Sequence, residues 1–284
     1  MLIFTIRNTI MRDFTLKTYL LLLSALKDND YQFQTFREFI KNPPYRSVIL
    51  RHDVDAKKMN SLRTAKLENE LGIRGTYYFR IVPESFDKEV IKQIYDMGHE
   101  VGYHYEDVST TALRQKKSVD DIMIAKTAIN SFKENLNKLR RIVPVETICM
   151  HGSPLSRWDN RLLWKYYDYR HFGIVGEPYF DTDFDEVLYL TDTGRRWDGE
   201  SVSIRDKVEG KAQGKQRNRE QKHPAPFNNF HSTFDIITAA RKNSLPDKIM
   251  LTVHPQRWDN RPLPWIKELV WQNIKNIGKR IINR

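Results

Sequence analysis

The sequence predicts an α/β protein built of parallel βα units that close toward a barrel, and three observations favour this class. Short apolar or β-branched segments alternate with segments of helical periodicity from residue 48 to residue 281. Ionisable residues directly follow several of the apolar segments, which is where barrel enzymes carry their chemistry. The 284 residues, 40% of them hydrophobic and 29% charged, are enough for one large globular domain.

The expected elements follow in chain order. Strands are expected where aliphatic, β-branched or aromatic residues cluster, at 48–55, 75–80, 100–105, 145–150, 187–190 and 249–253. Helices are expected where apolar residues recur at three and four positions, at 14–26, 31–40, 58–71, 86–97, 118–139, 161–166, 234–241 and 264–281. Gly72 and Gly98 end two of these helices, and Ser118 with Asp121 fits a capping box.

We expect a single domain over residues 11–284, in which 11–45 form an N-terminal helical cover and 205–224 a basic flexible loop. Residues 205–223 hold seven Lys or Arg against three acidic residues and almost no apolar ones. This composition is typical of a mobile loop. The alternative interpretation is an electrostatic attraction for an anionic substrate, such as one that carries a phosphate or diphosphate.

The net charge of +11 does not by itself indicate a nucleic-acid partner, because no recognised nucleic-acid-binding motif accompanies it. The apolar stretch 19–26 is far too short to span a bilayer, and 1–10 lacks a cleavage pattern. We therefore expect a cytoplasmic protein without a transmembrane segment. Cys149 is the only cysteine, which excludes an internal disulfide, and its apolar neighbours predict a buried strand thiol.

Ionisable side chains gather at the ends of the predicted strands. The strand-end segments, in chain order, are His52-Asp53-Val54-Asp55, Arg80, His104-Tyr105-Glu106-Asp107, His151-Gly152-Ser153-Pro154, Asp192-Thr193-Gly194 and His254-Pro255. Alternation along a strand puts Asp53 and Asp55 on one face, and two converging carboxylates need a cation or a proton between them.

A divalent metal bound by Asp and His, with one position open for water, accounts for this set of residues. A second carboxylate would accept the proton of the water, and a histidine would protonate the leaving group. The sequence has no Gly-rich phosphate loop, no Gly-x-Ser-x-Gly elbow and no setting for a cysteine nucleophile. The residues therefore favour metal-assisted hydrolysis over hydride transfer or acyl-enzyme chemistry.

The same residues resemble the polysaccharide deacetylase family, also called NodB-homology or carbohydrate esterase family 4. The similarity covers roughly residues 11–258 and is greatest to the intracellular branch found with bacterial surface-polysaccharide genes. The motifs that carry it are Arg51-His52-Asp53-Val54-Asp55, the stretch from Gly98 to His104, His151-Gly152-Ser153-Pro154 and Leu251-Thr252-Val253-His254-Pro255. The resemblance implies a distorted (β/α) barrel with about seven parallel strands.

The resemblance also implies roles for individual residues. Asp53 corresponds to the general base, Asp55 and His104 to metal ligands, and His254 to the general acid. The family's second motif is His-x-x-x-His, but the position four after His104 is Val108. Three alternatives follow: His151 is the first candidate for the third ligand, Glu106 or Asp107 is the second, and a degenerate relative without metal is the third.

Four residues near the strand ends are candidates for binding substrate: Arg80, Tyr105, Asp192 and Trp197. Arg80 can bind an anionic group of the substrate or pair with the site carboxylates. Asp192 can orient His254, bind sugar hydroxyls or simply form a turn. Trp197, like Trp158 and Trp258, lies in an Arg-Trp-Asp context, which suits either a rim that stacks on a sugar or a seal at the barrel end.

The resemblance implies a hydrolase that removes an N-acetyl group from an amino sugar of a polysaccharide or of its nucleotide- or lipid-linked precursor. It also implies a divalent metal cofactor, with zinc the first candidate. The alternative is a carbohydrate- or nucleotide-sugar-binding protein of the same fold that has lost the metal, and the position of Val108 motivates it.

Overall fold

The strand β2 (Ser47–Val54) forms the centre of the fold in the computed structural model, which describes residues 11–114, 120–153, 156–197 and 230–282. It pairs in parallel with β7 (Lys248–Val253) on one side and with β3 (Thr76–Phe79) on the other, and β1 (Gln32–Gln34) pairs with its first residues. Every residue of β2 is buried. A strand buried on both faces requires an apolar sequence, and residues 48–50 supply it.

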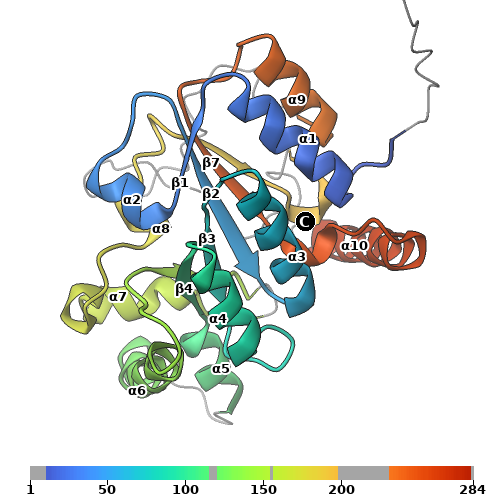
Figure 1. The fold of residues 1–284 in the computed structure, drawn as a ribbon. Coiled ribbons are helices and arrows are strands. Elements are labelled where there is room, and N and C mark those ends of the chain that lie inside the picture. The colour runs from blue at the N-terminus through green and yellow to red at the C-terminus, as the bar shows by residue number, and fades with distance from the viewer. Residues whose placement is uncertain (1–10, 115–119, 154–155, 198–229, 283–284) are drawn as a thin grey trace, which may run out of the picture.

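The other strands extend the sheet on both sides of β2. β4 (Glu100–Tyr105) and β5 (Ile148–Met150) follow β3, and β6 (Leu188–Thr191) follows β7. The order is β5-β4-β3-β2-β7-β6, and every pairing is parallel. The sheet is curled into a half-barrel with helices around it (Figure 1). The predicted distorted (β/α) barrel with about seven strands is thus confirmed, and within the described chain β5 and β6 are its unpaired edges.

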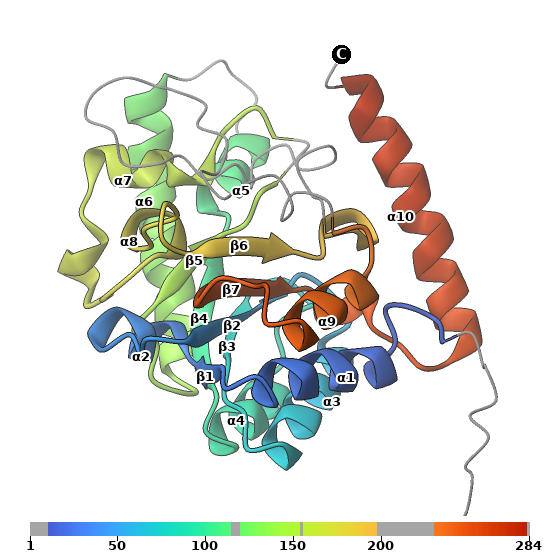
Figure 2. The ribbon, with the colours of Figure 1, turned by 90° about the horizontal axis from the view of Figure 1, so that it is seen from above.

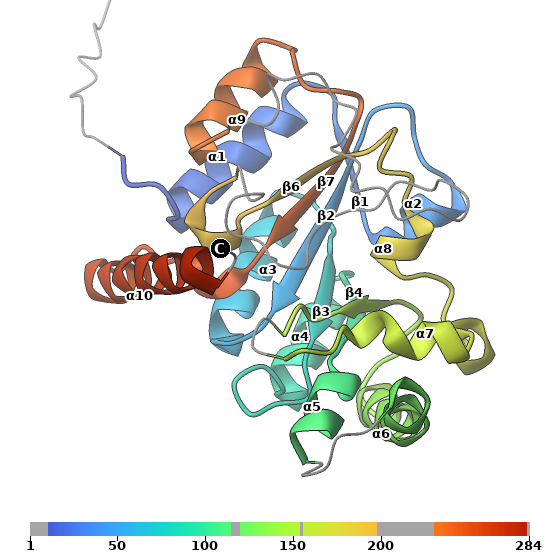
Figure 3. The same ribbon diagram turned by 180° about the vertical axis from the view of Figure 1, so that it is seen from behind.

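Helices cover the outside of the curled sheet. α1 (Leu16–Lys27) and α9 (Thr233–Arg241) lie side by side, as Figure 1 and Figure 3 both show. α3 (Lys58–Glu70) contacts α4 (Lys88–Asp96), and α6 (Asp121–Arg140) packs on β4. The other described α-helices are α2 (Phe36–Lys41), α5 (Asp107–Arg114), α7 (Leu163–Tyr166), α8 (Pro178–Asp181) and α10 (Pro262–Ile282). No described helix is long and apolar enough to cross a membrane.

Two large hydrophobic clusters hold the helices to the sheet. One joins α1 and α9 to β2 and β7 and contains Leu22, Ile236 and Leu251, all fully buried. The other joins α4 and α6 to β3 and β4 and contains Tyr77 and Phe132. Complete burial of one such side chain contributes about 1.5–3 kcal/mol. The sheet is therefore a rigid support for the residues that follow its strands.

The structure corrects several sequence-based expectations. The stretch 31–40 is not one helix, because Gln32–Gln34 form β1 beside β2 and only α2 is helical. Thr35 and Glu38 form the capping box of α2. The regular spacing of apolar residues over 31–40 concealed this helix start. The helix α5 was not predicted. Asp120 caps α6, whereas Ser118, the predicted cap, lies outside the described residues, as does the basic segment 205–224.

Candidate active site

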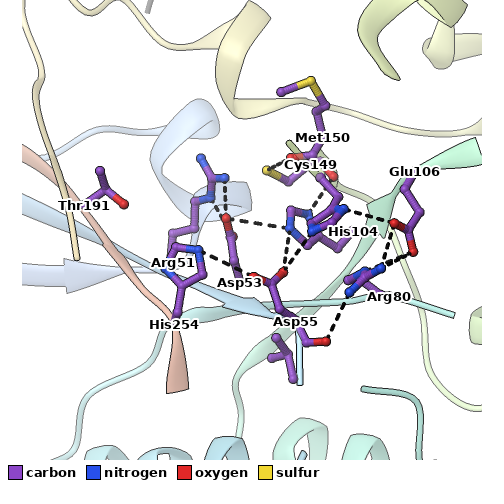
Figure 4. Close-up of polar contacts among 12 residues, drawn as sticks. Arg51, Asp53, Asp55, Arg80, His104, Glu106, Cys149, Met150, Thr191 and His254 are labelled. Atoms are coloured by element: carbon purple, nitrogen blue, oxygen red, sulfur yellow. Dashed lines mark hydrogen bonds and ion pairs between the residues drawn. The ribbon is translucent and has the colours of Figure 1, made fainter. Parts of the chain in front are cut away.

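The carboxyl ends of four strands bring five ionisable side chains together. Asp53 lies in β2 and Asp55 directly after it, His104 lies in β4, and His151 and His254 directly follow β5 and β7. Figure 4 shows Asp53, Asp55, His104 and His254 converging, with the Asp55 carboxylate between His254 and His104. We call Asp53, Asp55, His104, His151 and His254 the open cluster. The strand-end pattern of the sequence predicted all five.

Asp55 and two histidines have the geometry of a metal site. The Nε2 atoms of His104 and His151 each lie 3.5 Å from Oδ1 of Asp55. This oxygen is buried and has no hydrogen-bond partner in the described chain. The three ligand atoms lie within 4.8 Å of one another. Two imidazole nitrogens and a carboxylate oxygen that face a common point are a donor set that zinc and similar divalent ions accept. The residues present therefore fit the implied cofactor.

Both histidines are oriented through their other ring nitrogen. Nδ1 of His104 donates to the Cys149 carbonyl at 3.0 Å. Nδ1 of His151 lies 3.0 Å from Oε2 of Glu106 and 3.0 Å from the Ser153 hydroxyl. A proton on Nδ1 leaves the lone pair of Nε2 directed at Asp55, which is how metal-binding imidazoles are usually fixed.

The electrostatics of the site favour a positive charge at this point. Burial opposes the charged form of His104, but the carboxylates of Asp53 and Asp55 outweigh burial and raise the pKa of His104. Burial would also raise the pKa of Asp55, but His151, His104 and His254 outweigh it and lower that pKa well below its usual value. Asp55 is therefore a carboxylate at neutral pH, and the site attracts cations.

The two alternative third ligands point elsewhere. Glu106 accepts a bidentate ion pair from Arg80, at 2.7 Å for the shortest contact, so it supports His151 instead of facing Asp55. Asp107 accepts hydrogen bonds from Tyr103, Ser131 and Asn135, and burial raises its pKa to about 6. The side chain of Val108 is buried in the hydrophobic core. Of the candidates, only His151 is brought to Asp55.

Asp53 is held by Arg51, two residues earlier on the same face of β2. The guanidinium donates from Nε and Nη2 to the two carboxylate oxygens at 2.8 and 2.7 Å. Burial alone would raise the pKa of Asp53, but the charges of Arg51 and His104 outweigh it and lower the pKa to about 2. Oδ2 of Asp53 lies 3.8 Å from Nε2 of His104, so the carboxylate borders the metal site and remains ionised.

A second group of potential ligands overlaps the first. Asp53, His104 and Cys149 also place one ligand atom each within 4.8 Å of one another. Asp53 is already committed to the bidentate pair with Arg51, whose charge repels a cation. The thiol of Cys149 is buried in β5, as its apolar neighbours predicted. The set with Asp55 and His151 is therefore the better cation site.

His254 faces the open cluster from β7 and is oriented by Asp192. Oδ1 of Asp192 lies 2.6 Å from Nδ1 of His254, and Oδ2 accepts from the backbone N–H of His254 and from the indole of Trp258. Arg257 also contacts Asp192 and, outweighing the effect of burial, lowers the pKa of that carboxyl. Nε2 of His254 lies 3.8 Å from Oδ2 of Asp55, so it is the free end of the ring that reaches the site.

Three of the four predicted substrate-binding residues do not line the site. Asp192 is fully buried beneath His254, so of its predicted roles only the orientation of His254 fits. Tyr105 is fully buried against Phe132 and Trp164. Trp197 is 3% exposed and donates its indole N–H to Thr233 in the α1–α9 core. Tyr105 and Trp197 thus pack in the core and Asp192 contacts His254, and substrate binding by these residues stays a prediction.

Arg80 remains at the site and acts through its partners. Its guanidinium binds Glu106 and donates to the backbone carbonyl of Asp55 at 3.3 Å. A missed residue, Gln256, donates from Nε2 to Oδ2 of Asp55 at 3.3 Å. Gln256 comes two positions after His254, just beyond the end of β7. Its position after a strand could have identified it from the sequence.

A second carboxylate–histidine cluster lies on the opposite face of β2. Its members, which we call the sealed cluster, are Tyr19, His52, Glu68, Tyr77 and His99, each at most 2% exposed. Oε1 of Glu68 lies 2.9 Å from Nε2 of His52 and accepts from the hydroxyl of Tyr19 at 2.7 Å. Tyr77 donates to the same carboxylate at 2.9 Å. His52, which the sequence placed beside the site, belongs to this cluster.

No protein-family model and no curated protein matches the sequence. Among solved structures, the chain is similar to a CE4 family pseudoenzyme from Bacillus anthracis, with 12% identity, 83% of this chain and 64% of that chain covered, and a TM-score of 0.38. The Xyl-CE4 domain of a multidomain xylanase from the hindgut metagenome of Trinervitermes trinervoides matches at 10% identity, 83% and 85% coverage and a TM-score of 0.38. A peptidoglycan N-acetylglucosamine deacetylase matches at 15% identity, 83% and 85% coverage and a TM-score of 0.37.

The chain thus covers less than two thirds of the Bacillus anthracis pseudoenzyme. Because these TM-scores lie below 0.5, we draw no conclusion about activity from the matches. The similarity to polysaccharide deacetylases instead depends on the motif residues and on the way the curled sheet gathers them at one end.

Proposed function

We propose that the protein is a divalent-metal-dependent hydrolase that removes an N-acetyl group from an amino sugar. One observation carries the proposal: Oδ1 of Asp55, which has no hydrogen-bond partner in the described chain, lies 3.5 Å from Nε2 of both His104 and His151. Oδ2 of Asp53 lies 3.8 Å from Nε2 of His104, and Nε2 of His254 lies 3.8 Å from Oδ2 of Asp55, so both groups border this point. A cation site bordered by a carboxylate and an imidazole is suited to hydrolysis of an amide.

Asp55, His104 and His151 would hold the cation. A bound divalent ion supplies Lewis-acid activation of water and of the amide carbonyl. Gln256 and Glu106 support this set, because Gln256 donates to Asp55 and Glu106 fixes the ring of His151. Zinc is the first candidate from the two nitrogen ligands, and the donor set also suits other first-row ions.

Asp53 and His254 would move the protons. Asp53 accepts a proton from the water that attacks the acetyl carbon, and its ion pair with Arg51 keeps it aimed and ionised. His254 delivers a proton from Nε2 to the amine nitrogen as the carbon–nitrogen bond breaks, while Asp192 holds its Nδ1–H. The products are acetate and the free amino sugar, so atoms and charge balance.

The substrate we propose is a polysaccharide or its nucleotide- or lipid-linked precursor, of the kind used for bacterial surface polysaccharides in the cytoplasm. The sequence supports this choice through the motif resemblance and through the basic segment 205–223, which would attract an anionic carrier group. The two carboxylates of the open cluster would repel an anion, and Arg51 is already paired with Asp53. Groups outside the open cluster would therefore have to bind the anionic carrier.

The direct test is release of acetate from N-acetylated amino sugars by the purified protein, with and without a chelator. We expect activity that the chelator removes and an added divalent ion restores. Asp53→Asn is expected to lower kcat on the order of a thousand-fold, because the amide cannot accept the proton. Full activity of this variant would disprove the assignment of the base.

A binding protein without metal is the second candidate, and two observations favour it. Val108 is a core residue, so the usual second histidine has no polar replacement at its own position. A carboxylate whose pKa is about 2, such as Asp53, is a weak base. This candidate predicts that the protein binds N-acetylated sugars, lacks a stoichiometric ion and releases no acetate.

A further inference from the structure

The helix α10 has its polar and apolar faces reversed relative to an ordinary surface helix. Glu268, Gln272 and Asn276, at a spacing of four, are the buried residues on the side of α10 that faces the rest of the protein. Nζ of Lys57 lies 2.5 Å from Oε2 of Glu268, Gln272 donates to Oε1 of Glu268 at 2.8 Å, and Asn276 donates to the Gly194 carbonyl at 3.0 Å. Hydrogen bonds, instead of apolar packing, thus hold the inner face of this helix.

The outer face of α10 is apolar. Six large apolar side chains recur at three and four positions: Leu263 (80% exposed), Ile266 (49%), Val270 (53%), Trp271 (52%), Ile274 (55%) and Ile277 (59%). A surface helix normally buries such a stripe and exposes its polar residues. In Figure 2 the other labelled elements all lie to the left of α10, and none is labelled on its right. A contiguous apolar stripe of this kind marks an interaction surface.

α10 is joined to the open cluster by a short chain of contacts. Gln256 donates to Asp55, its backbone carbonyl accepts from Lys57, and Lys57 pairs with Glu268 of α10. In Figure 2, α10 lies beyond the ends of β6 and β7 toward which their arrows point. The apolar stripe therefore lies at the same end of the molecule as the candidate site.

The charges around the stripe identify its partner. Residues 262–284 contain five basic side chains and one acidic one, Glu268, which is paired with Lys57. Lys267 is exposed beside the stripe, whereas Lys275, also exposed, lies seven positions after Glu268 on the polar side of the helix. Two copies of α10 packed stripe to stripe would bring these like charges together, and Glu268, the one acidic residue of 262–284, is already paired with Lys57, which disfavours self-association. An anionic lipid surface supplies negative charge and an apolar layer at once.

We propose that α10 is an interfacial membrane-binding helix, which lies flat on an anionic lipid surface with its apolar stripe in the acyl boundary. Trp271 would sit at the headgroup level, where indole rings are favoured, and Lys267 would contact lipid phosphates. Docking in this way places the open cluster next to the lipid surface, within reach of a lipid-linked glycan. Vesicle binding does not require hydrolysis, so this proposal and the proposed function can fail separately.

The test is flotation of the full chain with vesicles made of equal parts phosphatidylglycerol and phosphatidylcholine, and with vesicles of phosphatidylcholine alone. The double variant Val270→Gln with Ile274→Gln removes the centre of the stripe and is exposed, so the fold should be kept. The matched control is Ile122→Gln with Met123→Gln, which removes two exposed apolar side chains from α6. We expect the α10 variant to bind anionic vesicles on the order of ten-fold more weakly than the wild type, and the control to bind as the wild type does.

A fluorescent label gives an independent readout. Cys149 is the only cysteine and is buried, so Ile274→Cys can be labelled selectively with an environment-sensitive dye. The dye should shift to the blue with anionic vesicles, whereas the same dye on Ile122→Cys should not. The proposal is overturned if the two double variants bind alike, or if the wild type does not float with anionic vesicles. A dimer in light scattering that Val270→Gln with Ile274→Gln dissociates, without vesicle binding, would assign the stripe to a second copy and equally overturn it.

Discussion

Two carboxylate–histidine clusters lie on opposite faces of the same strand, and they differ in one respect that decides their roles. His52 faces the sealed cluster, and its neighbour Asp53 faces the open cluster. In the sealed cluster Glu68 is fully buried and takes hydrogen bonds from both tyrosines. In the open cluster the Asp55 side chain is 24% exposed and its Oδ1 has no hydrogen-bond partner in the described chain.

Similar residues therefore have different roles, depending on whether all of their polar atoms have hydrogen-bond partners. A fully satisfied buried network stabilises the fold, and nothing is left over to bind a ligand. A carboxylate oxygen that has no hydrogen-bond partner and faces two imidazole nitrogens is a ready ligand for a cation. The sealed cluster therefore should govern stability, and the open cluster should govern metal binding and activity. The following variants separate the two.

The largest expected effect is that of Asp55→Asn on activity. The amide loses the negative charge that neutralises a cation, so acetate release should fall on the order of a thousand-fold or more. The free energy of unfolding should fall by less than it does in Glu68→Gln, because Asp55 accepts a hydrogen bond from Gln256 at Oδ2 and none at Oδ1. Kinetics and chemical denaturation measure the two quantities. Loss of stability with full activity would reverse the roles of the clusters.

The sealed cluster should show the opposite pattern. Glu68→Gln removes the negative charge that pairs with His52. It also places an amide N–H, which donates, next to hydroxyl groups that donate to the wild-type carboxylate. The free energy of unfolding should therefore fall by about 3 kcal/mol. Urea denaturation measures this loss, and metal content should be unchanged. Glu70→Gln, two residues further along α3 and exposed, is the matched control and should leave stability as it is. Equal stability of the two variants would contradict the comparison.

An intermediate effect is expected for Glu106, which contacts His151 of the open cluster. Glu106→Gln keeps the shape of the acceptor for Nδ1 of His151 but removes its charge. Metal affinity should weaken by about 10- to 100-fold, because a carboxylate partner raises the basicity of a ligating imidazole. Titration with a competing chelator measures this change. An affinity equal to that of the wild type would show that His151 does not depend on Glu106 or does not ligate.

The last effect concerns pH and lies beside the open cluster. Burial raises the pKa of Asp107 from 3.8 to about 6. Because the folded pKa is above the unfolded one, Asp107 favours folding below about pH 4, and this contribution is lost as the pH rises through about 6. The free energy of unfolding should therefore lose up to about 3 kcal/mol from this group across that window.

Asp107→Asn should flatten that dependence, since an amide does not titrate. Denaturation curves at pH 4, 5, 6 and 7 test this expectation, with the exposed Glu70→Gln as the control that keeps the wild-type slope. A slope between about pH 4 and 6 that is the same in the wild type and in Asp107→Asn would show that Asp107 titrates at an ordinary value.

The strand-end residues could be predicted from the sequence because all strands of a parallel half-barrel have their carboxyl ends on the same side. Asp55, His104, His151 and His254 each follow or end an apolar segment, and the curled sheet brings all such ends together. The departure at Val108 was also visible, and so was His151 as the first replacement. To find these residues, one needs to know only where each predicted strand ends, and local periodicity shows this.

The rest depended on contacts between distant segments, which local periodicity does not contain. Glu68 reads as an ordinary helical surface residue, and only Tyr19 from α1 and Tyr77 from β3 make it a buried centre. Trp197 and Tyr105 were assigned to substrate because they are aromatic and near strand ends, but their neighbours in space are core residues. The strand β1 was missed because three residues beside β2 leave no periodic signal.

The most direct test of the account is the metal content of the purified wild type beside Asp55→Asn, His151→Ala and Glu68→Gln, after equilibration with zinc and removal of the excess. Elemental analysis should find close to one ion per chain in the wild type and in Glu68→Gln, and far less in Asp55→Asn and His151→Ala. A wild type without bound ion would contradict the metal centre. Retention of the ion by Asp55→Asn or by His151→Ala would contradict its assignment to the open cluster.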